Sequence, residues 1–172
     1  VPKVKIIVNC TTDKNIRRYE EIKATFKSKL NLDFYYEENG FKGTFDSALR
    51  DIKTNRIMLC VDDQVFTKDI SYNEISEIGR NADFFTLRFG ENSSYSYNLD
   101  VEMEQPFDVS SHSAYYVWKC KLTMDDFNYA LSFDATVFNK FLLCAMSRYL
   151  VYSTPNQLES YMNYCKYLLF FF

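Results

Sequence analysis

Two adjacent carboxylates, Asp62 and Asp63, are the residues of this sequence best placed for chemistry. They come directly after Arg56–Val61, an almost uninterrupted apolar run that predicts a buried strand. Paired carboxylates at the exit of a strand suit Mg²⁺ or Mn²⁺, because these ions prefer oxygen ligands and carry substrate phosphates with them. An ordinary acidic turn has the same sequence, so the pair alone leaves both roles open.

The composition excludes several other kinds of site. The four glycines, Gly40, Gly43, Gly79 and Gly90, cannot form a dinucleotide-binding GxGxxG or a phosphate-binding GxxxxGK[ST] motif. The single histidine, His112, excludes a histidine-rich zinc site and would have to act as the base for any serine or cysteine nucleophile. Carboxylates are therefore the main source of reactive groups.

Charge and cysteine usage bear on partners and compartment. The 172 residues carry a formal net charge of −3 without a basic block, which argues against a nucleic-acid partner. The five cysteines are widely spaced and form no CxxC pair, which favours a reducing compartment. We therefore expect a cytoplasmic protein. No apolar stretch approaches the ~20 residues of a membrane span.

Alternating strand and helix patterns are expected to position these residues. Apolar runs predict strands at 4–10, 32–36, 56–61, 83–89 and 114–119. Helical spacing predicts helices near 13–30, 44–52, 71–79, 138–149 and from Thr154 onward. Their expected end signals are Thr44 as a cap, a capping box between Ser71 and Glu74, Gly79 as a stop, and Pro155 at a first helical position. The polar residues 91–112 predict a loop or excursion. Such alternation favours an α/β fold with a mostly parallel central sheet and helices on both faces. We expect one domain over 1–172, either a whole protein or one domain of a longer chain.

Ligands of a parallel sheet bind where the strands end, so the residues directly after each strand are candidates. Besides the pair described above, this rule selects Thr11 and Thr12 after the first strand and Glu37 and Glu38 after the second. Right-handed crossovers would bring these positions to one edge of the sheet.

Three segments, taken with their order and spacing, resemble a known family. Residues 57–66, IMLCVDDQVF, look like a strand and a DxD-type metal motif in the variant ending DD-x-x-F. Residues 126–138, DFNYALSFDATVF, are similar to a W-x-Y-P-L-S-x-D-G-x-I-F segment, and residues 153–159, STPNQLE, to an x-x-P-N-x-L-E helix start. The family is the nucleotide-diphospho-sugar glycosyltransferases of GT-A type, especially compact viral and bacterial members similar to glycosyltransferase family 2.

The resemblance implies a metal-dependent inverting hexosyltransferase of glycan biosynthesis. The donor would be UDP-glucose or a similar nucleotide-diphosphate sugar, and the acceptor a hydroxyl of a glycan or glycoprotein. Asp63, with Asp62 as second carboxylate, would hold Mn²⁺ or Mg²⁺, because Val61 occupies the first position of the DxD triplet. The same resemblance places the following residues beside the nucleotide: Thr11, Glu37 or Glu38, Asp46, Arg50 and Asp62.

An inverting transfer also needs a carboxylate that takes the proton from the attacking hydroxyl. We expect Asp134 to be this base, with Asp126 or Asp125 next in order. Asp134 has an alternative role as the N-cap of the helix predicted at 138–149, because Asp is a favoured cap. The chain departs from the family segment at Ala130 and Ala135, which replace a proline and a glycine.

Two other functions stay open on the sequence. A sugar nucleotidyltransferase also uses carboxylates and Mg²⁺, although its usual glycine-rich loop after the first strand is absent here. A binding module that has kept the fold and lost its activity would fit Val61 and the small size of the chain. Only the transferase and the nucleotidyltransferase would turn over a substrate.

Overall fold

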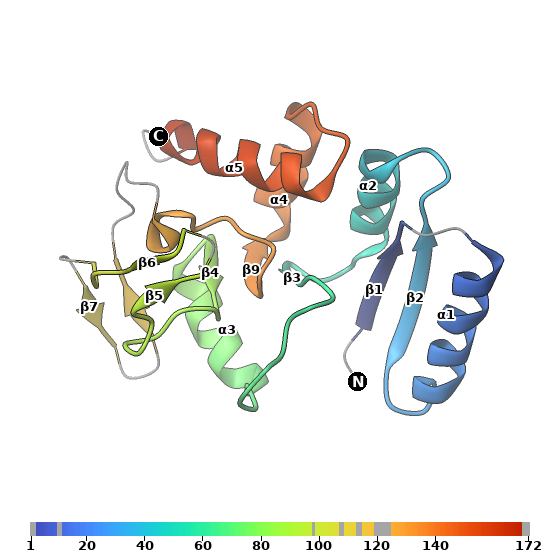
Figure 1. The fold of residues 1–172 in the computed structure, drawn as a ribbon, viewed down its shortest axis with the longest axis horizontal. Helices are drawn as coiled ribbons and strands as arrows, with labels where there is room; N and C mark the ends of the chain where they lie inside the picture. The colour runs from blue at the N-terminus through green and yellow to red at the C-terminus, as the bar shows by residue number, and fades with distance from the viewer. Residues whose placement is uncertain are drawn as a thin grey trace. The chain divides into compact units, whose positions relative to one another are not determined.

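The computed structural model describes residues 3–9, 12–97, 99–106, 109–112, 115–118 and 125–169. Helices and strands both occur along the chain, and the protein is a mixed α and β structure with small sheets (Figure 1). The chain forms two compact units. The first unit is Val1–Lys53 with Cys144–Leu158, and the second unit is Thr54–Leu143 with Glu159–Phe172. In the described ranges, no helix is both long and apolar enough to cross a membrane.

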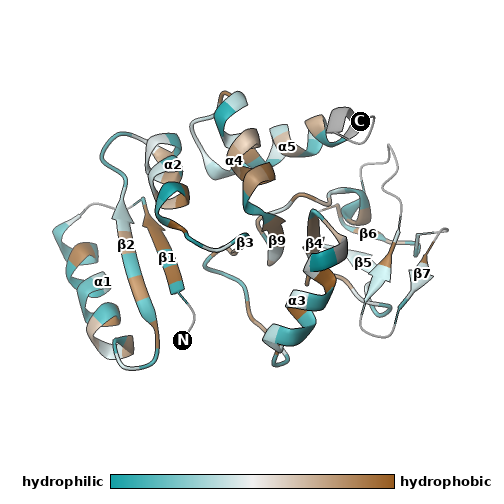
Figure 2. Ribbon diagram, turned by 180° about the vertical axis from the view of Figure 1, so that it is seen from behind, coloured by the Kyte–Doolittle hydropathy of each residue, from teal (hydrophilic) through white to brown (hydrophobic). Residues whose placement is uncertain are grey.

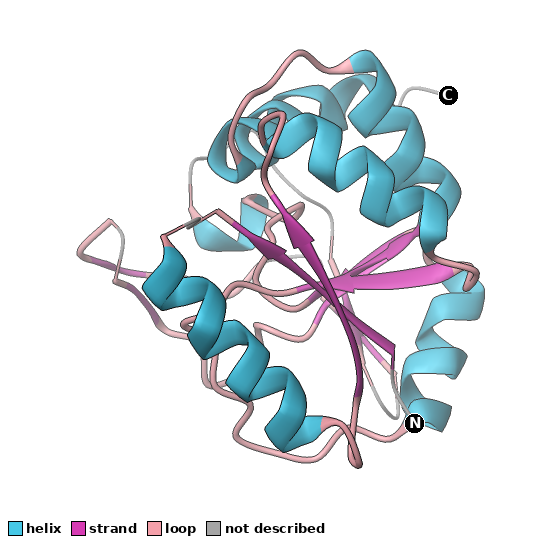
Figure 3. Ribbon diagram, turned by 90° about the vertical axis from the view of Figure 1, so that its right-hand side faces the viewer, coloured by secondary structure: helices cyan, strands magenta, loops and turns pink. Residues whose placement is uncertain are grey.

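The first unit contains β1 (Lys3–Val8), α1 (Asp13–Phe26), β2 (Asn31–Tyr36) and α2 (Phe41–Asp51). The strands β1 and β2 are parallel, in a register that pairs Val4 with Leu32 (Figure 3). Hydrophobic residues dominate β1 (Figure 2), as the apolar run predicted. Helix α1 packs on β2 through Tyr19 and Phe34, whose ring centroids are 5.9 Å apart. The predicted order of strand, helix, strand and helix is confirmed here.

Helix α2 begins earlier than its sequence predicted. Its N-cap is Gly40, whose φ of 81° lies in the left-handed region that glycine adopts without strain. Thr44, which we expected to cap the helix, lies inside the first turn and donates its hydroxyl to the Gly40 carbonyl at 3.1 Å. The earlier start adds Phe41 to the buried face of the helix.

The second unit is built on a small antiparallel sheet in which β9 (Thr136–Asn139) lies between β3 (Arg56–Leu59) and β4 (Phe84–Thr86). The mostly parallel central sheet that we expected is not seen among the described residues. β3 is an edge strand of this sheet. Because Met58 of β3 is 41% exposed, the apolar run of this strand is covered on one face only. The central strand is β9, whose first three residues are buried.

The predicted helix at 138–149 begins two residues later, as α4 (Lys140–Tyr149). The β-branched residues Thr136 and Val137 favour the extended β9 strand instead. The switch to helix follows Asn139, whose Oδ1 accepts the Phe141 N–H at 2.9 Å. Helix α5 (Pro155–Leu169) starts at the proline, as expected.

Helix α3 (Tyr72–Asn81) begins with the predicted capping box between Ser71 and Glu74. It runs past Gly79, where we expected it to stop. A Cβ at Gly79 would lie 3.3 Å from Arg56 Nε, so the glycine allows Arg56 to pack closely and to donate to the Gly79 carbonyl.

The expected excursion at 91–112 contains short antiparallel pairs. Strand β5 (Tyr95–Ser96) pairs with β6 (Val101–Glu102), and β7 (Ser110–Ser111) pairs with β8 (Tyr116–Val117). The strand predicted at 114–119 is therefore observed as β8, while Ala114 and Lys119 lie outside the described residues. A 3-10 turn, η1 (Asp126–Asn128), follows.

Candidate functional site

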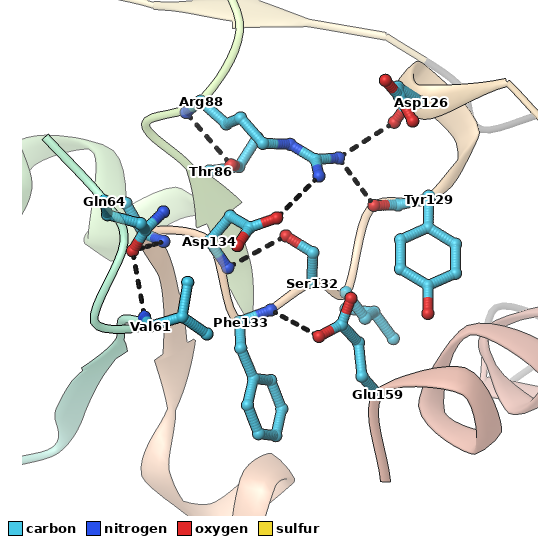
Figure 4. Close-up of polar contacts among 12 residues, drawn as sticks. Val61, Gln64, Thr86, Arg88, Asp126, Tyr129, Ser132, Phe133, Asp134 and Glu159 are labelled. Carbon is cyan, nitrogen blue, oxygen red and sulfur yellow. Dashed lines mark hydrogen bonds and ion pairs between the residues drawn. The ribbon is translucent and has the colours of Figure 1, made fainter. Parts of the chain in front are cut away.

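The antiparallel pairing of β3 and β9 brings two predicted site segments to the same edge of the sheet. Leu59, at the end of β3, pairs with Thr136, at the start of β9. Figure 4 shows Val61 and Gln64, which follow β3, at the edge where the chain enters β9 from Asp134. Asp62 and Asp63 lie between Val61 and Gln64 in the sequence. We call residues 61–64 the metal turn and residues 132–135 the Asp134 turn.

A glutamine connects the metal turn to the Asp134 turn. Gln64 Oε1 accepts the backbone N–H of Val61 at 3.3 Å and that of Ala135 at 3.1 Å (Figure 4). The first bond closes the metal turn, and the second crosses 71 positions of sequence. Asp62 and Asp63 are exposed beside this link.

The Asp134 turn is held by hydrogen bonds within itself and to two other segments, helix α5 and the residue after β4. Ser132 Oγ accepts the Asp134 N–H at 3.1 Å, and Glu159 Oε2 on α5 accepts the Phe133 N–H at 3.2 Å. The Ala135 carbonyl accepts the Leu87 N–H at 3.1 Å. Ala135 has a φ of 51°, which costs an alanine about 1–2 kcal/mol, so these bonds hold a conformation that the residue itself disfavours.

The guanidinium of Arg88 orients the Asp134 carboxylate. Nη1 of Arg88 lies 3.1 Å from Asp134 Oδ2, and Nη2 donates to the carbonyls of Asp126 and Tyr129, each at 3.1 Å. Arg88 Nε is buried without a hydrogen-bond partner among the described residues. The Asp134 side chain is 35% exposed to solvent, so a ligand can reach it.

Glu159 is an ionisable group whose pKa is altered by its environment at the Asp134 turn. Burial raises the pKa of its carboxyl group; the Phe133 N–H opposes this rise, and the charge of Asp134 adds to it. Burial also raises the pKa of the Cys60 thiol, while the backbone of Ala135 opposes that rise. The Asp134 turn is thus flanked by a carboxyl and a thiol that both resist ionisation.

The metal turn fits a hard divalent cation through the chemistry of its donors. Asp62 and Asp63 are exposed carboxylates with no ion pair to any described residue. Within the described ranges, no group of three or more His, Cys, Asp or Glu residues could hold a metal ion by itself. A cation here would take one or two carboxylates from the chain and its other ligands from phosphate and water, the usual arrangement for Mg²⁺.

The alternative role for Asp134 as a helix cap is wrong. β9 separates Asp134 from α4, so the side chain cannot reach the first turn of that helix. Asp125, one of the runner-up bases, has a capping role instead: its Oδ1 accepts the Asn128 backbone N–H at 3.0 Å and the Asn128 side chain at 2.7 Å. Asp126 stays a candidate, because only its backbone carbonyl is used by Arg88.

Apart from Asp62, the predicted nucleotide-binding residues belong to the first unit, and all of them keep their roles as predictions. Glu37 and Glu38 follow β2, as expected. Asp46 accepts from Ser147 Oγ and lies 3.8 Å from Lys42 Nζ, so its carboxylate already stabilises the packing of α2 and α4. Arg50 donates to Ser47 Oγ at 2.7 Å. Thr11 lies outside the described residues.

Sequence reasoning missed Gln64, Arg88 and Glu159 as site residues. Gln64 and Glu159 lie inside segments that carried the family resemblance, at positions to which we had assigned no role. Arg88 is a charged residue at the end of an apolar run, which was a usable signal for a strand-end site residue. Comparisons of this chain with protein-family models, curated proteins and solved structures gave no match.

Proposed function

We propose that this chain is a metal-dependent inverting glycosyltransferase that transfers a hexose from a nucleotide-diphosphate sugar, a UDP-sugar such as UDP-glucose, to a hydroxyl of a glycan. The observation that carries the proposal is the convergence of the three segments with family resemblance. Gln64, Asp134 and Glu159 come one from each segment. Asp134 lies in the Asp134 turn, and the side chains of Gln64 and Glu159 accept backbone N–H groups of the same turn. Segments that merely share a chance likeness would have no reason to meet.

The backbone of Ala135 supports the same alignment. The family segment carries a glycine directly after its aspartate, and here that position has a φ of 51°. Glycine is the usual residue in the left-handed region, so the alanine has kept the turn that a glycine would form without strain.

The proposal includes the GT-A type of fold. The parallel pair β1 and β2, each followed by a helix, supports it. The antiparallel sheet around β9 departs from a mostly parallel arrangement. The fold class therefore supports the proposal less than the site does.

The chemistry of glycosyl transfer suits the two turns. Asp63 and Asp62 would hold Mg²⁺ or Mn²⁺, and such an ion, when bound, stabilises the negative charge that forms on the leaving diphosphate. Asp134 would accept the proton of the acceptor hydroxyl as its oxygen attacks the anomeric carbon from the opposite face. The ion pair uses Oδ2 of Asp134, so Arg88 fixes the carboxylate while Oδ1 lies outside that pair.

Titration calorimetry and a turnover assay test the proposal directly. UDP is titrated into the purified chain with Mn²⁺, with Mg²⁺ and with excess chelator, and release of UDP from UDP-glucose and other UDP-sugars is then followed with glycan acceptors. We expect binding that requires the divalent ion and turnover that requires an acceptor. Absence of metal-dependent binding for every nucleotide diphosphate tried would overturn the metal assignment.

A binding module without activity is the second candidate, because one carboxylate oxygen of Asp134 is already engaged by Arg88. Such a module would bind UDP with the metal ion and release no UDP from any donor. The same two assays therefore separate the two candidates.

A further inference from the structure

The side chain of Gln64 stands between the two turns of the candidate site. Its oxygen accepts the N–H of Val61, the residue directly before Asp62. The same oxygen accepts the N–H of Ala135, the residue directly after Asp134. One amide oxygen thus bonds the backbone beside the proposed metal ligands and the backbone beside the proposed base (Figure 4).

The other side-chain hydrogen bonds to the Asp134 turn come from elsewhere. Ser132, Glu159 and Arg88 bond to this turn without bonding to residues 61–63, and the Cys60 thiol, directly after β3, interacts with the Ala135 backbone. The Ala135 N–H is shared between two acceptors, because it also donates to the Phe133 carbonyl at 3.1 Å, and Ala135 is only 5% exposed. Loss of the glutamine oxygen would remove one acceptor of this buried N–H and the acceptor of the Val61 N–H at once, and for this reason the two turns should move together.

We infer that Gln64 is a positioning residue through which binding at the metal turn is transmitted to the Asp134 turn. The inference rests on the proposed function, since it takes the ligand at the metal turn to be a divalent cation with a nucleotide diphosphate. A displacement of the metal turn toward its ligand would carry the Val61 N–H and the Gln64 oxygen with it. Ala135, and Asp134 next to it, would follow.

The link itself is tested without ligand, by amide hydrogen exchange measured by NMR on the whole chain. Gln64→Met keeps the length of the side chain but removes the amide oxygen, and Gln64→Glu restores an acceptor oxygen. The Ala135 amide keeps the Phe133 carbonyl as an acceptor in Gln64→Met, so we expect it to exchange roughly 3- to 10-fold faster there, and near the parent rate in Gln64→Glu. Gln64→Ala repeats the measurement if the methionine disturbs the fold.

A matched control is Gln105→Met in the same unit. Gln105 Nε2 donates to the carbonyls of Glu91 and Ser93, so this change also removes hydrogen bonds of a glutamine. It should leave the exchange of Ala135 unchanged. Equal exchange rates at Ala135 in Gln64→Met and in Gln105→Met would show that Gln64 does not hold the turn, and would overturn the inference.

Transmission is tested by adding Mg²⁺ with UDP and following the amide signals of Asp63 and Ala135. In the parent and in Gln105→Met both signals should shift, whereas in Gln64→Met the shift should persist at Asp63 and be lost at Ala135. A shift at Asp63 without one at Ala135 in the parent, or an Ala135 shift that survives in Gln64→Met, overturns the inference and leaves the proposed function standing. Absence of any shift at Asp63 in the parent overturns the proposed function instead.

Discussion

The ion pair between Arg88 and Asp134, 3.1 Å from Nη1 to Oδ2, joins residues 46 positions apart at the centre of the candidate site. The same guanidinium donates to the carbonyls of Asp126 and Tyr129. Arg88 therefore has two roles that can be measured separately. It stabilises the segment 126–129, and it holds the carboxylate of Asp134, which we propose as the base.

Replacement of Arg88 by methionine should lower the free energy of unfolding by about 2–4 kcal/mol, because two carbonyls and a carboxylate lose their donor. Urea unfolding can be followed by the fluorescence of Trp118, the only tryptophan, whose Nε1 donates to the Phe127 carbonyl at 3.0 Å. The exposed Arg80 is the control, and Arg80→Met should stay within about 0.5 kcal/mol of the parent. Similar losses for both variants would contradict the role assigned to Arg88.

Asp134→Asn should separate turnover from binding. Asparagine keeps the shape of the side chain but cannot take up the proton of an acceptor hydroxyl, so transfer should fall by roughly 10²–10⁴-fold. Affinity for UDP with Mn²⁺ should barely change, since the metal ligands lie on the other turn. A normal rate for Asp134→Asn with a collapse for Asp126→Asn would move the role of base to Asp126.

Asp63→Ala should abolish metal-dependent binding of UDP while leaving the unfolding midpoint within the error of the parent. The side chain is exposed and has no ion pair among the described residues, so little of the folded structure depends on it. Asp69→Ala, also at an exposed carboxylate that follows β3, is the matched control and should bind as the parent does. Calorimetry with Mn²⁺ and UDP measures both, and equal affinities would exclude Asp63 as a metal ligand.

The buried carboxyl of Glu159 should make stability fall as pH rises. Burial raises the pKa of Glu159 above its usual value of 4.5, so at pH values between the unfolded and folded pKa the folded chain binds more protons than the unfolded chain. Stability contributed by this group is then present below pH 4.5 and decreases as pH rises through the folded-state pKa. The urea midpoint of the parent, relative to that of Glu159→Gln, should decline over this range.

Glu74→Gln provides a control of opposite sign for this measurement. Hydrogen bonds from Ser71 lower the pKa of Glu74, so its contribution is present above the usual pKa and is lost as pH falls. The midpoint of the parent relative to Glu74→Gln should therefore rise with pH. The same slope for both glutamate variants would show that the two environments do not differ as described.

Ala135→Gly should stabilise the chain by up to about 1 kcal/mol. Glycine adopts a φ of 51° without strain, which stabilises the folded chain. This gain in free energy exceeds the loss that arises because glycine gives the unfolded chain more conformational entropy. Ala24→Gly, at an exposed position inside α1, is the control and should destabilise by about 1 kcal/mol. Loss of stability in both variants would mean that the Ala135 turn is not left-handed in solution.

The sequence alone was enough to predict those helices and strands that depend only on residues close to one another in the chain. The apolar run of β1, the capping box of α3 and the proline at the start of α5 each depend on residues a few positions apart, and each predicted its element correctly. Asp62 and Asp63 were also selected from the sequence, because their residue type and their place after an apolar run are visible there, whereas Asp134 was selected through the family resemblance and Glu159 was missed.

Only the tertiary structure decided how those elements pair and which side chains meet. β9 is a four-residue strand whose apolar pattern runs on into α4, and it becomes a strand because β3 and β4 supply hydrogen-bond partners on both sides. Gln64 meets Ala135 across 71 positions, and Glu159 meets Phe133 across 26. Such contacts follow from the register of β3 against β9 and from the packing of α5, which no local pattern encodes.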